Sequence, residues 1–122
     1  MEKGLTYTSR TIVNKNNTAL TLGSGDMEVL GTPAMLALME NAAMNSVCSH
    51  LPEGSTTVGS MIESTHIRPS AIGETITATA TLEKIENRKL TFKVTAADSK
   101  GLIGEGTHIR YIVDRKRFLG KL

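Results

Sequence analysis

Three consecutive runs in the second half of the chain, 73–86, 89–98 and 102–114, restrict its fold most strongly. The first two carry an apolar residue at nearly every second position; in the first run these are Ile76, Ala78, Ala80 and Leu82. A period of two is typical of a strand that is buried on one side. The short polar segments ENRK and DSKG between the runs suit hairpin turns. The sequence therefore predicts consecutive antiparallel strands.

Two further segments have the composition of strands. The Thr-rich, β-branched segment 5–13 and the segment 56–67 both favour extended structure. NKNN, at 14–17, predicts a turn directly after the first strand. The segment 19–31 is interrupted by glycines, and we interpret it as a short edge strand followed by a flexible loop.

One segment, TPAMLALMENAAMNS, has the character of a helix. Thr32 is placed to cap its N-terminus, and Pro33 fits the first helical position. We expect the helix to continue to about His50, because LPEG follows and ends it. The segment is apolar on most sides, which is typical of a central buried helix rather than a surface one.

This order of elements predicts an α+β fold in two layers, with the helix lying across the concave face of one antiparallel sheet. A length of 122 residues fits a single domain spanning 1–122. Aromatic residues make up only 3% of the chain, and tryptophan is absent. We therefore expect the core to consist of aliphatic, methionine and alanine side chains.

Charge and composition argue against several classes of protein. The net charge of +2 is too small to indicate a nucleic-acid partner. No apolar run approaches the roughly 20 residues of a membrane span, and no signal peptide is expected because the first residues lack an apolar stretch. Cys48 is the only cysteine, so we expect no disulfide within the chain and a reducing, cytoplasmic location. The three histidines lack the spacing of metal ligands, and no metal is expected.

A carboxylate stands in the middle of the apolar helix. The neighbours of Glu40 one helical turn away are all apolar: Leu36, Ala37, Ala43 and Met44. An ionised carboxylate in apolar surroundings is unfavourable unless it is paired or hydrogen-bonded, and such groups gather at active sites. Glu40 is therefore a candidate general base or nucleophile. The alternative is that it borders the polar residues of the helix and simply reaches solvent.

The segment 66–113 resembles the strand core of the hotdog-fold acyl-CoA thioesterases. The shared pattern is a proline, then Gly73 at the start of a long strand, then a hairpin, and finally GEGTHIR. Together with GTPAML, LMENA and ESTHIRP, it is similar to the fluoroacetyl-CoA thioesterase family of that superfamily. The resemblance implies a hotdog fold that hydrolyses a small acyl-CoA, with CoA as part of the substrate and no separate cofactor. It also implies a homodimer with its active sites near the subunit boundary.

By the same resemblance, the candidate catalytic residues are Thr32, Glu40 and His66. Glu40 would act as base or nucleophile, His66 as acid or base, and Thr32 would bind the acyl end. Thr32 and Glu40 are eight positions apart, about 12 Å along a helix axis, and are not expected to touch. From the residues alone, Thr32 can also be an ordinary helix cap. His66 shares a period of two with Val58 and Ile62, so it faces the helix if they do; it can also be structural.

The candidate substrate-binding residues are Gly59, Arg68 and Arg110. Gly59 interrupts a strand, which indicates a bulge or a close approach of substrate to its N–H; the alternative is a kink that curls the sheet. The two arginines and the basic segment 115–117 suit the phosphates of CoA, although a basic tail is often only solvated. His50 is interpreted as structural, and His108, which shares the alternation of Arg110, is not favoured as a site residue.

Other functions remain open at this point. Some hotdog domains bind acyl-CoA without cleaving it, and in such a sensor Glu40 and His66 would only line a pocket. A hydratase or dehydratase is less favoured, because the motifs of those enzymes are not visible. The segment LTLGSGDMEVL lacks the aromatic residues that the family has ahead of the helix, and the acyl group is not predicted.

Overall fold

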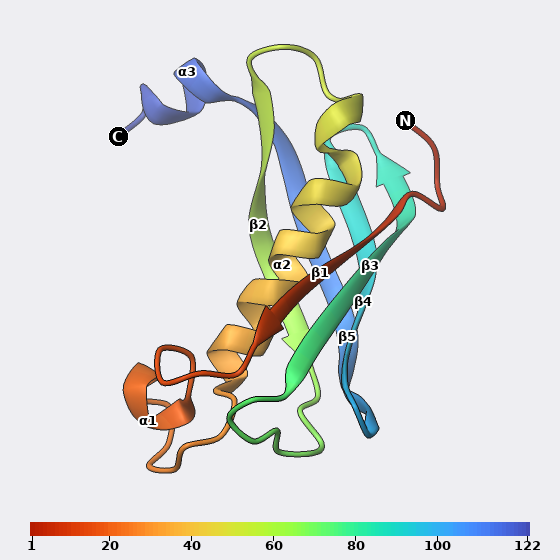
Figure 1. Ribbon diagram of the computed structural model, residues 1–122. Coiled ribbons are helices and arrows are strands. Elements are labelled where there is room, and N and C mark those ends of the chain that lie inside the picture. The colour runs from red at the N-terminus through yellow and green to blue at the C-terminus, as the bar shows by residue number, and fades with distance from the viewer.

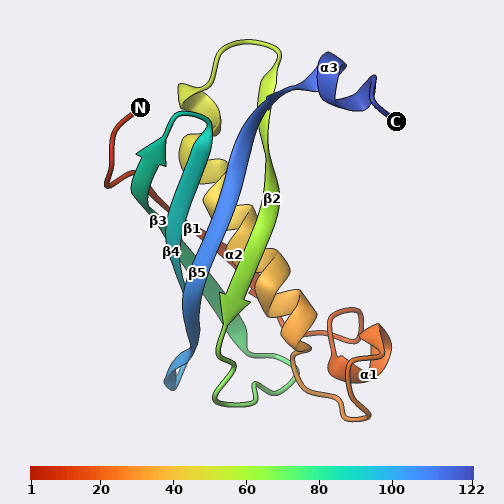
Figure 2. The ribbon, with the colours of Figure 1, turned by 180° about the vertical axis from the view of Figure 1, so that it is seen from behind.

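A curled sheet of five antiparallel strands forms one layer of the molecule in the computed structural model, which describes residues 1–122. The order across the sheet is β1-β3-β4-β5-β2. The strands are β1 (Thr6–Ile12), β2 (Ser55–Ser64), β3 (Thr75–Glu86), β4 (Lys89–Asp98) and β5 (Gly101–Asp114). The expected series of hairpins from β3 to β5 is confirmed, and β2 lies at one edge of the sheet (Figures 1 and 2).

A single long helix, α2 (Thr32–Val47), forms the second layer. It lies against the face around which the sheet curls (Figure 1) and packs mainly on β3 and β1. The predicted two-layer α+β architecture is therefore confirmed. Two short helices, α1 (Ala19–Leu22) and α3 (Arg115–Leu119), lie near opposite ends of the molecule. None of the helices is both long and apolar enough to cross a membrane.

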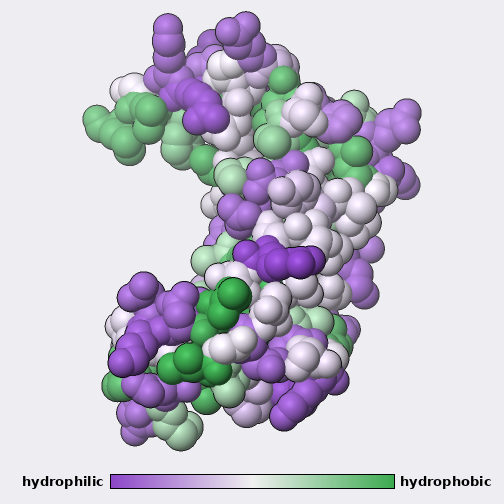
Figure 3. Space-filling model, in the orientation of Figure 1, coloured by the Kyte–Doolittle hydropathy of each residue, from purple (hydrophilic) through white to green (hydrophobic).

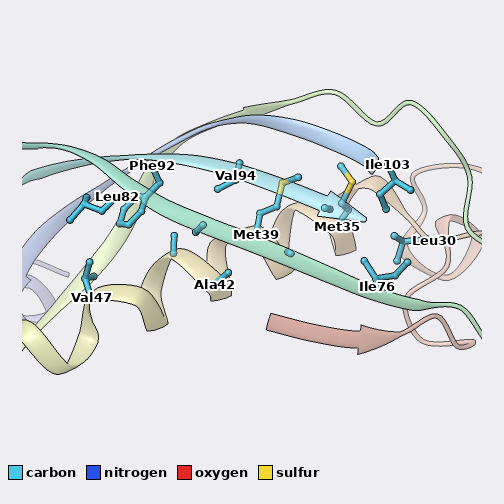
Figure 4. Packing of buried hydrophobic residues seen from close by; sticks show 14 of the residues in the cluster. Leu30, Met35, Met39, Ala42, Val47, Ile76, Leu82, Phe92, Val94 and Ile103 are labelled. Carbon is cyan, nitrogen blue, oxygen red and sulfur yellow. The ribbon is translucent and has the colours of Figure 1, made fainter. Parts of the chain in front are cut away.

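The core between helix and sheet is aliphatic, as expected from the composition. Figure 4 shows its packing, in which Phe92 is the only aromatic member. Four alanines are completely buried where the two layers meet: Ala42, Ala43, Ala78 and Ala80. Small side chains allow helix and sheet to approach closely. Met35 and Met39 fill the remaining space with flexible side chains.

The boundaries of α2 differ from those expected. Gly31 is the N-cap, and its carbonyl accepts the first helical hydrogen bonds, so Thr32 is the first helical residue and caps nothing. The prediction of Thr32 as a cap is therefore wrong. The α-helix ends at Val47, and a turn of 3₁₀-helix, η1 (Cys48–His50), completes the segment that was expected to be α-helical.

The segment ahead of α2 is helical rather than extended. The side chain of Thr18 accepts a hydrogen bond from the Thr21 N–H and caps α1, which ends at Gly23 with a φ of 77°. A left-handed C-terminal residue of this kind favours glycine. The predicted edge strand is wrong here. Extended pairing is limited to isolated bridges, one of which joins Thr18 to Leu30.

A bulge in β2 changes which side chains face the helix. The pairing with β5 shifts between Gly59 and Met61. Before the bulge, Gly59 faces α2; after it, Ile62 packs against the core. The expectation that Val58 and Ile62 share a face is wrong, because the extra residue reverses the alternation.

Two glycines of β5 allow the end of β2 to pack closely on that strand. A Cβ atom on Gly106 would run into the backbone of Glu63, and one on Gly104 would run into the Thr65 carbonyl. The glycines of the GEGTHIR motif therefore determine how near the chain beyond β2 lies to β5. That chain carries His66.

We expect Gly106→Ala to destabilise the fold, because the new methyl group meets backbone atoms that cannot move aside without disturbing the β2–β5 pairing. Overpacking of this kind lowers the free energy of unfolding by about 1–3 kcal/mol. Urea denaturation measures the change. Glu105→Ala, at the exposed neighbouring position, serves as a control and should have little effect. Equal stability of the two variants would show that the strands can separate at no cost.

Candidate active site

The hydroxyl of Thr32 and the imidazole of His66 form a short hydrogen bond. Thr32 Oγ1 lies 2.7 Å from His66 Nδ1, and either atom can donate, depending on the tautomer of the ring. Thr32 is available for this contact because the helix uses Gly31 as its cap. His66 follows β2 by two residues and is flanked by backbone hydrogen bonds from Thr65 and Ile67 to β5. The fold thus brings together two of the predicted site residues.

A cavity of about 320 Å³ opens beside this pair. Thr32 and His66 line it together with apolar side chains from the loop after α1, namely Met27, Val29 and Leu30. A site of this size is at the lower end of small-ligand pockets in general. Figure 3 shows exposed hydrophobic residues gathered over the same end of the molecule, where Leu20, Leu22 and Met27 are exposed.

His66 is neutral near neutral pH. Burial lowers the pKa of its imidazole below the ordinary 6.5, while the backbone of Arg68 acts in the opposite direction. Its Nε2 is buried and has no hydrogen-bond partner. A neutral imidazole with one nitrogen on a hydroxyl and the other free is able to accept or deliver a proton.

Glu40 belongs to a second group, on the β2–β5 side of α2. Its Oε2 lies 3.6 Å from Nη1 of Arg110 and 3.9 Å from Nε2 of His108. A Cβ atom on Gly59 would stand 2.7 Å from the same oxygen, so the missing side chain at Gly59 makes room for the carboxylate. The side chain of Glu40 is 40% exposed. The apolar neighbours along the helix therefore do not bury it.

Arg110 is buried, and every nitrogen of its guanidinium faces protein. Nε donates to Thr57 Oγ1 at 2.8 Å and Nη2 donates to the Thr57 carbonyl at 2.9 Å. Burial lowers the pKa of Arg110, and the Glu40 carboxylate raises it. Glu40 is the carboxylate that balances this buried charge.

The two groups are separated within one chain. Thr32 and Glu40 lie eight residues apart on α2, about 12 Å along its axis, and Glu40 contacts His108 and Arg110 rather than His66. The sequence did not favour His108 as a site residue, although it lies two positions before Arg110 in an alternating strand. That spacing places both side chains on the face that meets Glu40.

Arg68, predicted to bind substrate, is held by an ion pair. Its Nη2 lies 2.7 Å from Oδ1 of Asp98, and the side chain also donates to the carbonyls of Gly101 and Leu102. Burial raises the pKa of Asp98, but hydrogen bonds from Ser70, the Lys100 backbone and Arg68 together lower it below its ordinary value. Arg68 therefore anchors the chain beyond His66 while also lining the cavity.

The basic segment 115–117 lies in α3. Asp114 is the N-cap of this helix, and its side chain accepts a hydrogen bond from the Arg117 N–H. All three of its basic side chains are exposed. The helix lies at the end of the molecule away from α1 and the Thr32–His66 pair (Figure 1).

Comparison with known proteins gives consistent results. Residues 13–116 match the family described as fluoroacetyl-CoA-specific thioesterase. The fluoroacetyl-CoA thioesterase of Streptantibioticus cattleyicolor is 36% identical over 95 residues, which are 78% of this chain and 68% of that protein. The solved structure of the fluoroacetyl-CoA thioesterase FlK superposes with a TM-score of 0.92 at 31% identity, covering 99% of this chain and 94% of that one.

Other solved structures share the fold. A thioesterase superfamily member from Thermus thermophilus, TTHA0967, has a TM-score of 0.90 at 25% identity over 98% of this chain and 89% of that one. A hot-dog-like protein from Thermanaerovibrio acidaminovorans also has a TM-score of 0.90, at 24% identity, covering 99% of this chain and 90% of that one. The hotdog fold implied by the sequence is thereby confirmed.

We expect Thr57→Val to destabilise the protein more than Thr57→Ser. Valine removes the hydroxyl that accepts from Nε of Arg110 and leaves a buried charged donor without a partner, whereas serine keeps the acceptor. The loss for valine should be about 1–3 kcal/mol in the free energy of unfolding, measured by denaturant titration. If Thr57→Ser lowered the free energy of unfolding as much as Thr57→Val, packing of the threonine methyl group would be responsible instead of the hydrogen bond.

Proposed function

The chain belongs to the family of fluoroacetyl-CoA-specific thioesterases, and from this premise we propose that it hydrolyses a small acyl-CoA to a free acid and CoA. The observation that carries the proposal is the short Thr32–His66 pair beside a cavity, in a chain that matches the family over most of its length. A structure of one FlK variant contains fluoroacetate and CoA, the acid and the thiol that such a reaction releases. We also propose a reducing, cytoplasmic location, which the single cysteine favours.

In the proposed reaction, the acyl end of the substrate lies in the cavity beside Thr32, whose hydroxyl orients it. His66, neutral near pH 7, accepts a proton from attacking water and then, as imidazolium, delivers it to the departing CoA sulfur. Glu40 acts either as the base toward water in place of His66, or as the nucleophile on the thioester carbonyl; in the second case CoA leaves as a mixed anhydride forms, and water activated by His66 hydrolyses that anhydride to the free acid. Gly59, Arg68 and Arg110 bind the substrate or hold the residues around it.

A homodimer is part of the proposal. β2 is an edge strand of ten residues whose outer side is unpaired within the chain, and the exposed Met61 and Ile67 lie on it or just beyond it. Figure 3 shows that the surface is hollowed along this side, between α3 and α1. Pairing of two β2 edges would protect them from other strands. It would also bring together the β2–β5 sides of two copies, on which Glu40 is partly exposed. One substrate would then contact Glu40 of one copy and the Thr32–His66 pair of the other.

The decisive experiment is an assay of free-thiol release across a panel of acyl-CoA substrates from acetyl-CoA upward, with fluoroacetyl-CoA included. We expect turnover of at least one short acyl-CoA. Thermal stabilisation by acyl-CoA without thiol release would instead support a non-catalytic sensor. Light scattering coupled to size-exclusion chromatography determines whether the species in solution is a dimer.

Removal of either proposed catalytic side chain should lower kcat strongly. His66→Ala and Glu40→Gln should each reduce it by roughly 10²–10⁴-fold, the usual scale for general acid–base groups. Because the pKa of His66 lies below 6.5, activity of the unchanged protein should persist as the pH falls somewhat below that value. His50→Ala, at an exposed position, is the control, and turnover of either site variant at the control's rate would remove that residue from the mechanism.

The sharing of a site between copies is tested by mixing the two inactive variants. If Glu40 and His66 of different chains form one site, a mixed dimer of Glu40→Gln and His66→Ala retains one intact site, and activity returns on subunit exchange. If both residues act within one chain, every site in the mixture lacks one group and activity stays absent.

Simultaneous replacement of Arg115, Lys116 and Arg117 by alanine should raise KM for CoA esters and leave kcat nearly unchanged, because these residues are proposed to hold the phosphates of CoA and lie far from the reacting bond. The rise should be smaller at high salt, which screens exposed charges. A charge-matched triple variant at Lys3, Lys84 and Lys93, all exposed, controls for net charge. A change confined to kcat would refute the role in CoA binding.

A further inference from the structure

A buried histidine lies behind the pair of Glu40 and Arg110 and takes no part in the reaction proposed above. His108 is 1% exposed and belongs to β5. Its ring lies against Phe92, with 6.2 Å between the ring centroids. Its two nitrogens face different elements, and each has a polar neighbour.

Those neighbours determine where the proton of the ring resides. Nδ1 lies 2.7 Å from the carbonyl oxygen of Met61, and a carbonyl only accepts, so Nδ1 carries the hydrogen. Nε2 lies 3.2 Å from Nη1 of Arg110, and a guanidinium only donates, so Nε2 presents its lone pair. The two contacts together select one neutral tautomer.

Burial, more than the charges around the ring, favours the same neutral state and keeps the pKa of His108 below its ordinary value. Burial lowers the pKa of His108; the Met61 carbonyl opposes this, Arg110 lowers the pKa further and Glu40 raises it. Glu40 faces the ring from α2 and Arg110 from β5. The neighbours from β2 and β4 are the Met61 carbonyl and Phe92, which do not titrate.

We propose that His108 is a positioning residue, which accepts a hydrogen bond from Arg110 and thereby aims this guanidinium at Glu40. The proposal rests on the thioesterase function proposed above. Thr57 fixes Nε and Nη2 of Arg110, and His108 fixes Nη1, the nitrogen that also faces Glu40. Glu40 is 40% exposed, so without this fixed cation its carboxylate is free to turn toward solvent.

Two replacements of His108 separate the acceptor from the rest of the ring. His108→Gln can present its amide oxygen where Nε2 stands, whereas His108→Asn can reach only the place of Nδ1 and offers Arg110 no acceptor. We expect asparagine to lower kcat by roughly 10- to 100-fold through misplacement of Glu40, with KM much less affected. Glutamine should restore most of this loss. His50→Asn is the matched control and should behave as the unchanged protein.

Either of two kinetic results would overturn the proposal: full activity of the asparagine variant, or an equal loss in both variants. Thermal melting confirms that each variant is folded. If the asparagine variant does not fold, NMR of the unchanged protein tests the proposal instead, because it reports which nitrogen of His108 is protonated. In ¹⁵N-histidine NMR at pH 7, the signals absent from His108→Gln should belong to a neutral ring protonated at Nδ1.

A ring protonated at Nε2, or at both nitrogens, would contradict the positioning role of His108 but not the proposed thioesterase function. The NMR result does not depend on turnover. Absence of thiol release by the unchanged protein would therefore contradict the proposed function without being confused with a failure of the proposal for His108.

Discussion

Arg110 brings a positive charge into the interface between helix and sheet, and the position of Glu40 follows from it. Arg110 is 6% exposed, and two of its guanidinium nitrogens are held by Thr57. A buried cation requires a nearby anion, because its desolvation is otherwise uncompensated. Glu40 is that anion, which explains why an apolar helix keeps a carboxylate in its middle.

Three glycines make this arrangement possible. Gly59 leaves space for the carboxylate of Glu40. Gly104 and Gly106 let the end of β2 lie against β5, which brings His66 to the N-terminal end of α2. Gly59 lies beside a bulge, which accounts for a glycine inside this strand. The atom that approaches it within the chain is a carboxylate oxygen, that of Glu40.

The electrostatic character of the two groups differs. At one end of α2, a neutral imidazole and a hydroxyl line a cavity that apolar side chains complete. Two turns along the helix, a carboxylate faces a buried guanidinium. Hydrolysis of a thioester requires both a proton carrier and a group that activates water or attacks the carbonyl. A second copy joined along β2 would supply both kinds of group to one substrate.

Local pattern was sufficient for the central strands, the long helix and the family, although not for the segment 19–31. Alternation along 73–98 and the hairpin sequences determined the antiparallel strands, because side chains of a half-buried strand must alternate. The motifs around Thr32, Glu40 and His66 indicated the thioesterase family, which the comparisons confirm. The catalytic roles of these three residues stay predictions.

Tertiary structure decided what depends on contacts between distant segments. The hydroxyl of Thr32 bonds to His66 instead of capping its own helix, because Gly31 already provides the cap. Gly59 indicated a bulge, but only the pairing with β5 shows where the extra residue lies and that it reverses the faces of β2. His108 has importance through its strand neighbour Arg110 and through Met61 and Glu40, which lie far from it in sequence. Sequence periodicity tells which side of a strand a residue occupies, whereas hydrogen-bond partners are selected only when separate elements meet.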